Sequence, residues 1–92
     1  MAVEFITIIW RLSPYRAEKL LVQLAFADWS NLDGEFHPTY TEVAEKARIT
    51  KAGAIGIVQS MIDDKEIEMI ERGGTGRGNR NRYRFAEKYI KA

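Results

Sequence analysis

The chain has no cysteine, which excludes disulfide bonds and thiolate metal sites. Its one histidine, His37, has no partner residue at metal-ligand spacing, so we expect neither a metal nor another cofactor. Long apolar runs are missing too: the longest early run, Phe5 to Trp10, ends at Arg11, well short of the ~20 residues that span a bilayer. No basic segment or small-residue cleavage site precedes this run, so we expect a cytoplasmic protein without a membrane partner.

Residue sets for catalysis are absent as well. The glycine-rich segment 73–78 is no phosphate-binding loop, because no Lys-Ser/Thr pair follows it and a strand is expected next. Segment 29–40 has the length of a calcium loop, but Trp29 and Tyr40 stand where carboxylate ligands are required. No nucleophile, base and orienting group assemble, so the sequence predicts no enzyme, no catalytic residue and no small-molecule substrate.

The composition that remains is that of an ordinary small globular protein. The chain has 92 residues, of which 46% are apolar and 29% are charged. A chain of this size buries somewhat over ~60% of its unfolded surface, which is enough for it to fold alone with modest stability. We therefore predict a single domain over residues 1–92.

Charge is distributed unevenly along the chain. Residues 72–84 hold five of the 14 basic residues and none of the 13 acidic ones, so this segment carries +5 and the remainder carries −4. Clustered guanidinium groups suit a phosphate backbone, since their binding releases counterions. The distribution of charge, and not the net charge of +1, therefore predicts a nucleic-acid partner.

The N-terminal third predicts a strand and a long helix. Residues 3–12 are rich in β-branched and aromatic side chains and favour a strand; a short buried helix is the alternative, because the run has no decisive period. Ser13 and Pro14 suit the N-cap and the first position of a helix that ends near Trp29. The helical period predicts a buried stripe made of Ala17, Leu20, Leu21, Leu24 and Ala25.

The remainder of the chain predicts two short helices and a hairpin. Thr39 and Glu42 form a capping-box pattern at the start of a two-turn helix, and Thr50 caps a second helix that runs to about residue 64. Alternating residues from Ile67 onward and in 82–85 predict two strands joined across the glycine-rich loop. The expected apolar positions of the second helix are Ala54, Ile55, Val58, Met61 and Ile62.

Two short helices joined by about three residues and followed by a hairpin are typical of an α+β winged helix-turn-helix fold. We expect a three-helix core and a small antiparallel sheet within residues 10–85, with the hairpin of residues 67–85 as the wing. Tyr83 and Phe85 should face the core. Phe36 belongs to an edge strand or an extended connector, and residues 86–92 form a last helical turn.

Four segments resemble the winged-helix domain of phage and plasmid replication proteins. They are LLVQLAFADWSNLDG at 20–34, HPTYTEVA at 37–44, RITK at 48–51 and GGTGRGNRNRYRF at 73–85. The resemblance, which covers residues 10–85, implies binding of double-stranded DNA at origins or operators, and so a role in replication or transcription regulation. The family places arginine and threonine near positions 52, 53 and 56, where this chain has Ala52, Gly53 and Gly56.

The candidate DNA-binding residues lie on the second helix of the pair and on the wing. In this fold the N-terminal residues of that helix meet base edges, and only Lys51 and Gln59 have the chemistry to read a base. We expect Arg77 and Arg80 at the tip of the wing, and the alternate arginines of 80–84 on one face of a strand. The full set is Thr50, Lys51, Gln59, Arg72, Arg77, Asn79, Arg80, Asn81, Arg82 and Arg84.

A protein-interaction module on the same scaffold is the competing hypothesis. The apolar and glycine-rich stretch 52–58 suits the docking of a partner or of a second copy, as in an adaptor, an inhibitor or a homodimer. The predicted N-terminal strand either pairs across a two-fold axis or joins the sheet of its own chain. For the arginines, the alternatives are a solubilising surface hairpin and RNA binding by the Arg-Gly segment alone.

Overall fold

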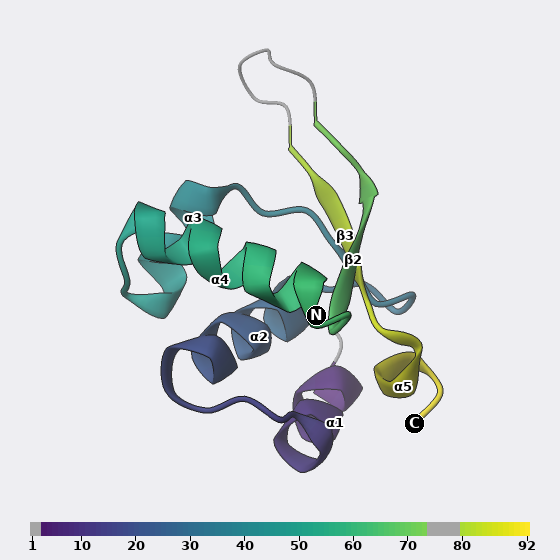
Figure 1. The fold of residues 1–92 in the computed structure, drawn as a ribbon. Helices are drawn as coiled ribbons and strands as arrows, with labels where there is room; N and C mark the ends of the chain where they lie inside the picture. Colours follow the sequence, from purple (N-terminus) through teal and green to yellow (C-terminus); the bar gives the residue numbers. More distant parts are fainter. Residues whose placement is uncertain (1–2, 74–79) are drawn as a thin grey trace.

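Five helices and a three-stranded antiparallel sheet make up residues 3–73 and 80–92, the part of the chain that the computed structural model describes (Figure 1). The predicted α+β class is confirmed. The predicted site residues Arg77 and Asn79 lie outside the described residues. The elements are α1 Val3–Leu12, α2 Ala17–Trp29, β1 Glu35–Phe36, α3 Tyr40–Ala47, α4 Lys51–Asp63, β2 Ile67–Glu71, β3 Arg82–Phe85 and α5 Glu87–Ile90.

The hairpin of β2 and β3 lies to one side of α2, α3 and α4 (Figure 1). Figure 1 shows this hairpin projecting away from the helices, with α4 across the front and α1 and α5 at the opposite end of the molecule. Strand β3 is central, because the strand order is β1-β3-β2. Among the described residues, no helix has both the length and the apolar character that crossing a bilayer requires.

The prediction of a strand at residues 3–12 was wrong, because this segment is the helix α1. Its buried side chains, Phe5 and Ile9, are four residues apart, which is the spacing of one helix face. Phe5 packs against Phe85 of β3, with 5.4 Å between the ring centroids. Contacts of this kind override the strand propensity of β-branched residues, which depends strongly on packing context.

The predicted start of α2 was also wrong, whereas its end at Trp29 is confirmed. The predicted stripe is right only in part: Ala25 is buried and Leu20 and Leu24 pack against the core, but Ala17 and Leu21 are exposed. Ser13 does not cap the helix: its hydroxyl accepts a hydrogen bond from the Tyr15 amide at 3.1 Å and donates one to Gln23 at 2.5 Å. The helix therefore begins three residues after Pro14. The stripe is rotated, since Val22 and Phe26 are buried whereas Leu21 is 52% exposed. The prediction assumed that the leucines face the core. In the structure, the packing of Phe26 against Phe36 determines which face of the helix is buried.

The helix pair α3 and α4 confirms the predicted caps. The Thr39 hydroxyl accepts a hydrogen bond from the Glu42 amide at 3.1 Å, and the Glu42 carboxylate accepts one from the Thr39 amide at 2.8 Å. Thr50 caps α4 by accepting a hydrogen bond from the Gly53 amide at 3.0 Å. The predicted apolar positions of α4 are buried at Ala54, Val58 and Met61, but Ile55 is 42% exposed.

The sheet confirms the predicted hairpin, and of the two alternatives for Phe36, an edge strand or an extended connector, it shows the edge strand. β3 pairs in antiparallel register with β1 and with β2, and the β2 pairing is irregular between Met69 and Glu71. Tyr83 and Phe85 are buried, as predicted. Phe36 stacks with Phe26 of α2, with ring centroids 4.5 Å apart, and lies 5.7 Å from the Tyr83 ring. This aromatic cluster joins the sheet to the helices.

A buried acid ties the C-terminal helix to the body of the domain. Glu66, 5% exposed in the turn between α4 and β2, accepts hydrogen bonds from the Tyr89 hydroxyl at 2.5 Å and from the Lys88 ammonium at 2.7 Å. Burial, followed by the hydrogen bond to Glu66, raises the pKa of Tyr89 well above its usual range. The predicted last helical turn is thus α5, and it is held by a charge-assisted pair.

Stability should fall as the pH rises above ~10, the ordinary pKa of tyrosine. Burial raises the pKa of Tyr83 to about 12, and Tyr89 is shifted in the same direction. Between these values the unfolded chain loses protons that the folded chain keeps. Each such tyrosine should therefore lower the free energy of unfolding by up to ~1.4 kcal/mol per pH unit above pH ~10. Urea titrations followed by circular dichroism across this range measure the slope.

The control for this pH dependence is Tyr89→Phe. The variant loses the hydrogen bond to Glu66 and should be less stable at neutral pH, but its stability should decline less steeply above pH ~10 because one retained proton is gone. A wild-type free energy of unfolding that stays constant from neutral pH to about pH 11 would contradict the assignment.

Candidate nucleic-acid interface

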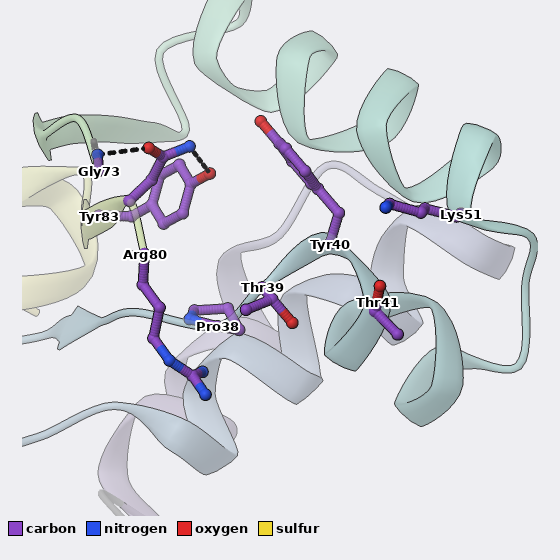
Figure 2. A pocket seen from close by; sticks show the side chains of 9 residues that line it. Pro38, Thr39, Tyr40, Thr41, Lys51, Gly73, Arg80 and Tyr83 are labelled. Atoms are coloured by element: carbon purple, nitrogen blue, oxygen red, sulfur yellow. Dashed lines mark hydrogen bonds between the residues drawn. The ribbon is translucent and has the colours of Figure 1, made fainter. Parts of the chain in front are cut away.

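A concave surface lies where α3 and α4 begin and the hairpin has its root. Its volume is about 270 Å³. It unites segments that are some 40 residues apart in the chain, and Figure 2 shows the side chains around it. The lining residues are Pro38, Thr39, Tyr40, Thr41, Lys51, Gly73, Arg80, Asn81 and Tyr83.

The lining of this concavity includes the hydroxyl groups of Tyr40 and Thr41 and the ammonium group of Lys51. In Figure 2, Tyr40 lies between Tyr83 and Lys51, and the Lys51 ammonium points toward Tyr40 with Thr41 beside it. Hydroxyl and ammonium donors are groups that proteins direct at phosphate and sugar oxygens. The first amides of α3 and α4 add partial positive charge at the same place, because helix N-termini carry the positive end of the macrodipole. This surface can therefore hold an anionic backbone.

Asn81 closes the root of the hairpin. Its side-chain oxygen accepts a hydrogen bond from the Gly73 amide at 2.7 Å, and its side-chain nitrogen donates one to the Tyr83 hydroxyl at 3.2 Å (Figure 2). Both the oxygen and the nitrogen of the Asn81 side chain thus have hydrogen-bond partners within the protein. The geometry makes Asn81 a structural residue of the concavity, while its predicted contact to DNA stays a prediction.

Arg80 does not extend from a strand with the other arginines, because β3 begins only at Arg82. Its guanidinium group runs past Pro38 and Thr39 (Figure 2), forms an ion pair with Glu42, and donates a hydrogen bond to the His37 carbonyl at 3.4 Å. The Thr39 amide, and then Arg80, hold the pKa of the Glu42 carboxyl below its ordinary value. This arginine therefore links the hairpin to the start of α3.

Arg82 and Arg84 share the solvent face of β3, opposite Tyr83, and both face acids. Arg82 lies 3.5 Å from a Glu35 carboxylate oxygen and 4.0 Å from one of Glu71, measured from its guanidinium nitrogens. Arg84 lies 3.9 Å from Glu68, and its Nε donates to the Asp33 carbonyl at 3.4 Å. The acids come from β1 and β2. The +5 segment is therefore partly neutralised in space.

The predicted residues of α4 are separated from one another along the helix. The Thr50 hydroxyl is occupied by its cap, and Lys51 borders the concavity. Gln59 lies two turns further along and donates a hydrogen bond to Asp63 at 3.1 Å. Between Lys51 and Gln59, the exposed residues are small or apolar: Ala52, Ile55 and Gly56.

The described residues thus divide the predicted cations into two groups. Arg80, Arg82 and Arg84 have acidic partners, whereas Lys51 and Arg72 are exposed and form no ion pair within the described ranges. Sequence reasoning missed Tyr40 and Thr41 as site residues. The signal that could have found them is the capping box, which places both in the first turn of α3, next to the start of α4.

Comparison of the chain with protein-family models, with curated proteins and with solved structures finds no match. Its function is therefore inferred from its own sequence, geometry and charge.

Replacement of Gly56 by alanine should stabilise the protein. A Cβ atom at this position would have no atom within 4 Å, so nothing opposes the substitution. Alanine is favoured over glycine in a helix interior by ~1 kcal/mol, and the free energy of unfolding from a urea titration should rise by about that amount. The matched control is Gly53→Ala, whose Cβ would lie 3.1 Å from the Thr50 cap oxygen and should bring a smaller gain or none. A loss of stability in Gly56→Ala would show that other atoms lie against α4 at Gly56.

Replacement of Gly73 by alanine should destabilise the root of the hairpin. A Cβ atom there would lie 2.7 Å from the carbonyl carbon of Arg80 and 2.9 Å from its amide nitrogen, which are backbone atoms that cannot turn aside. We expect a loss of ~1–3 kcal/mol in the free energy of unfolding, as for other overpacked sites. Thermal melts and urea titrations measure it. An unchanged unfolding midpoint would mean that the backbone at Gly73 and at Arg80 can move apart without a loss of stability.

Proposed function

We propose that the chain is a non-enzymatic protein that binds double-stranded DNA with a winged helix-turn-helix fold. The observation that carries the proposal is the concavity in which the N-termini of α3 and α4 and the root of the hairpin meet around Lys51. The resemblance to phage and plasmid replication proteins supports the same assignment and favours a role in replication or transcription regulation.

The order of the elements supports this fold. α3 and α4 are joined by residues 48–50 and are followed directly by the hairpin of β2 and β3. In a winged helix the second helix of such a pair enters the major groove, and the hairpin flanks it as the wing. The projection of the hairpin beyond the helices in Figure 1 suits this role, since a duplex could contact both elements at once.

The geometry assigns different roles to the basic residues. Lys51 and Arg72, which have no ion pair within the described ranges, would contact phosphates. Arg80 would have to break its ion pair with Glu42 before it could bind a phosphate. Arg84 would stabilise the sheet through its contact with Glu68 and would not bind DNA. Base reading would depend on Lys51 and Gln59 alone, because the helix between them offers no hydrogen-bonding side chain. Affinity would therefore come mainly from phosphate contacts and vary little with DNA sequence.

A salt series of duplex binding tests the proposal. For each phosphate contact that is lost, the slope of log affinity against log salt should become less negative by ~1. Lys51→Ala should produce this change, and Arg77→Ala is the corresponding test of the predicted wing tip. Lys91→Ala is the matched control, because Lys91 pairs with Glu87 in the C-terminal helix. Equal slopes for Lys51→Ala and Lys91→Ala would refute the assignment of the concavity.

Arg84→Ala separates structural arginines from DNA-binding ones. Since the guanidinium group faces Glu68 and the Asp33 carbonyl, we expect a small loss of stability, within the ~0–1 kcal/mol typical of exposed pairs. The salt slope should remain that of the wild type. A change of the slope by ~1 would instead show that Arg84 contacts a phosphate.

A protein-interaction module remains the second candidate, because the exposed face of α4 is apolar at Ala52 and Ile55 and open at Gly56. Ile55→Lys distinguishes the two functions by the sign of its effect. On a DNA-facing helix the added ammonium group should tighten duplex binding and steepen the salt slope. On a protein-facing helix the same charge would be buried, and it should abolish the complex.

A further inference from the structure

The side of α1 that faces away from the core has no covering element within the described residues. Phe5 and Ile9 point into the core. The opposite side, which we call the α1 outer face, consists of Glu4, Thr7, Trp10 and Arg11, all exposed. Trp10 is 64% exposed, although a tryptophan of this size gains a great deal from burial. This face therefore offers an unused apolar contact.

The charges of the α1 outer face are arranged as a self-complementary pair. Glu4 lies in the first turn and Arg11 in the last turn of the helix. Seven residues separate them, which is two turns or ~10 Å along the axis, too far for an ion pair within one helix. Within residues 3–73 and 80–92 neither has another ion-pair partner. A second helix running in the opposite direction would bring opposite charges together at both ends.

We propose that the α1 outer face binds the same face of a second copy of this chain. The two α1 helices would lie antiparallel across a two-fold axis that passes beside Thr7. The 180° rotation about this axis places Glu4 against Arg11 of the second copy, and Arg11 against its Glu4. Trp10 then lies over the flank that carries Ile6 of the other helix, which is only partly buried in its own chain. Each contact occurs twice, as a two-fold interface requires.

Three physical terms favour this pairing. The two ion pairs are attractive, and a like-charged alternative would be repulsive. Antiparallel helices align opposite ends of their dipoles. The small side chain of Thr7 at the axis allows the backbones to approach. One ten-residue helix per copy covers little area, so the dimer belongs to the transient class that buries less than ~1,200 Å² in total.

The pairing leaves the candidate DNA interface open. Figure 1 shows α1 at the end of the molecule opposite the projecting hairpin. Self-association and DNA binding can therefore be measured separately, and failure of one does not imply failure of the other. The proposal goes beyond the DNA-binding function and does not depend on it.

Sedimentation velocity over a concentration series up to millimolar protein tests the proposal. The wild type should shift from monomer toward dimer as the concentration rises. Glu4→Arg, which sets two guanidinium groups against each other, and Arg11→Glu, which does so with two carboxylates, should each weaken the dimer at least tenfold. The double variant Glu4→Arg/Arg11→Glu should restore it, because the pairs are then exchanged rather than lost.

Two further variants guard against an effect on folding. The charge exchange opposes the dipole of α1, so each variant is first checked by circular dichroism and thermal melting. Thr7→Arg and Trp10→Ala change exposed side chains without reversing the end charges, and both should abolish the dimer while the melting temperature stays near that of the wild type. Ile55→Asn, on the exposed face of α4, is the matched control and should dimerise like the wild type.

Three outcomes would overturn the proposal. The first is a wild type that stays monomeric at every concentration. The second is a dimer that survives Thr7→Arg or is lost in Ile55→Asn, which would place the interface elsewhere. The third is binding of the monomer to anionic phospholipid vesicles in a manner that requires Trp10, since the α1 outer face would then be a membrane contact.

Discussion

The packing of the central strand β3 against the helices is the constraint on which the rest of the structure depends. One face of β3 sends Tyr83 and Phe85 into the aromatic cluster with Phe26 and Phe36. The strand also pairs with β1 on one side and β2 on the other, so it is the sole link between them in the sheet of the described residues. Without this cluster, the hairpin would have no fixed position relative to α3 and α4, and the concavity between them would not exist.

On the opposite face of β3, the positive charge of residues 72–84 is partly neutralised by nearby acids. Arg82 and Arg84 have no acidic neighbour in their own stretch of sequence, yet the sheet places carboxylates from both adjacent strands beside them. Exposed pairs of this kind contribute little to stability individually, but they neutralise charge that a phosphate backbone would otherwise meet. The surface that remains for an anion is therefore the meeting point of α3, α4 and the hairpin root, where Lys51 is accompanied by hydroxyl donors.

The domain also separates its exposed apolar surfaces in space. The open side of α4, with Ile55, adjoins the candidate interface, and the α1 outer face, with Trp10, lies at the end of the molecule away from the hairpin (Figure 1). The two proposed contacts, with DNA and with a second copy, would therefore lie on separate parts of the molecule.

Local interactions determined what the sequence by itself could specify. The caps at Thr39 and Thr50 and the alternation of buried residues in β3 act within a few positions, so α3, α4 and the hairpin followed from the sequence alone. Tertiary packing decided the rest. Segment 3–12 became a helix because Phe5 and Ile9 meet the core on one helical face, and α2 turned Phe26 inward instead of Leu21. The arginines met acids that are up to 47 residues away in the chain, and no pattern along one segment contains such a contact, because the register of the sheet sets it.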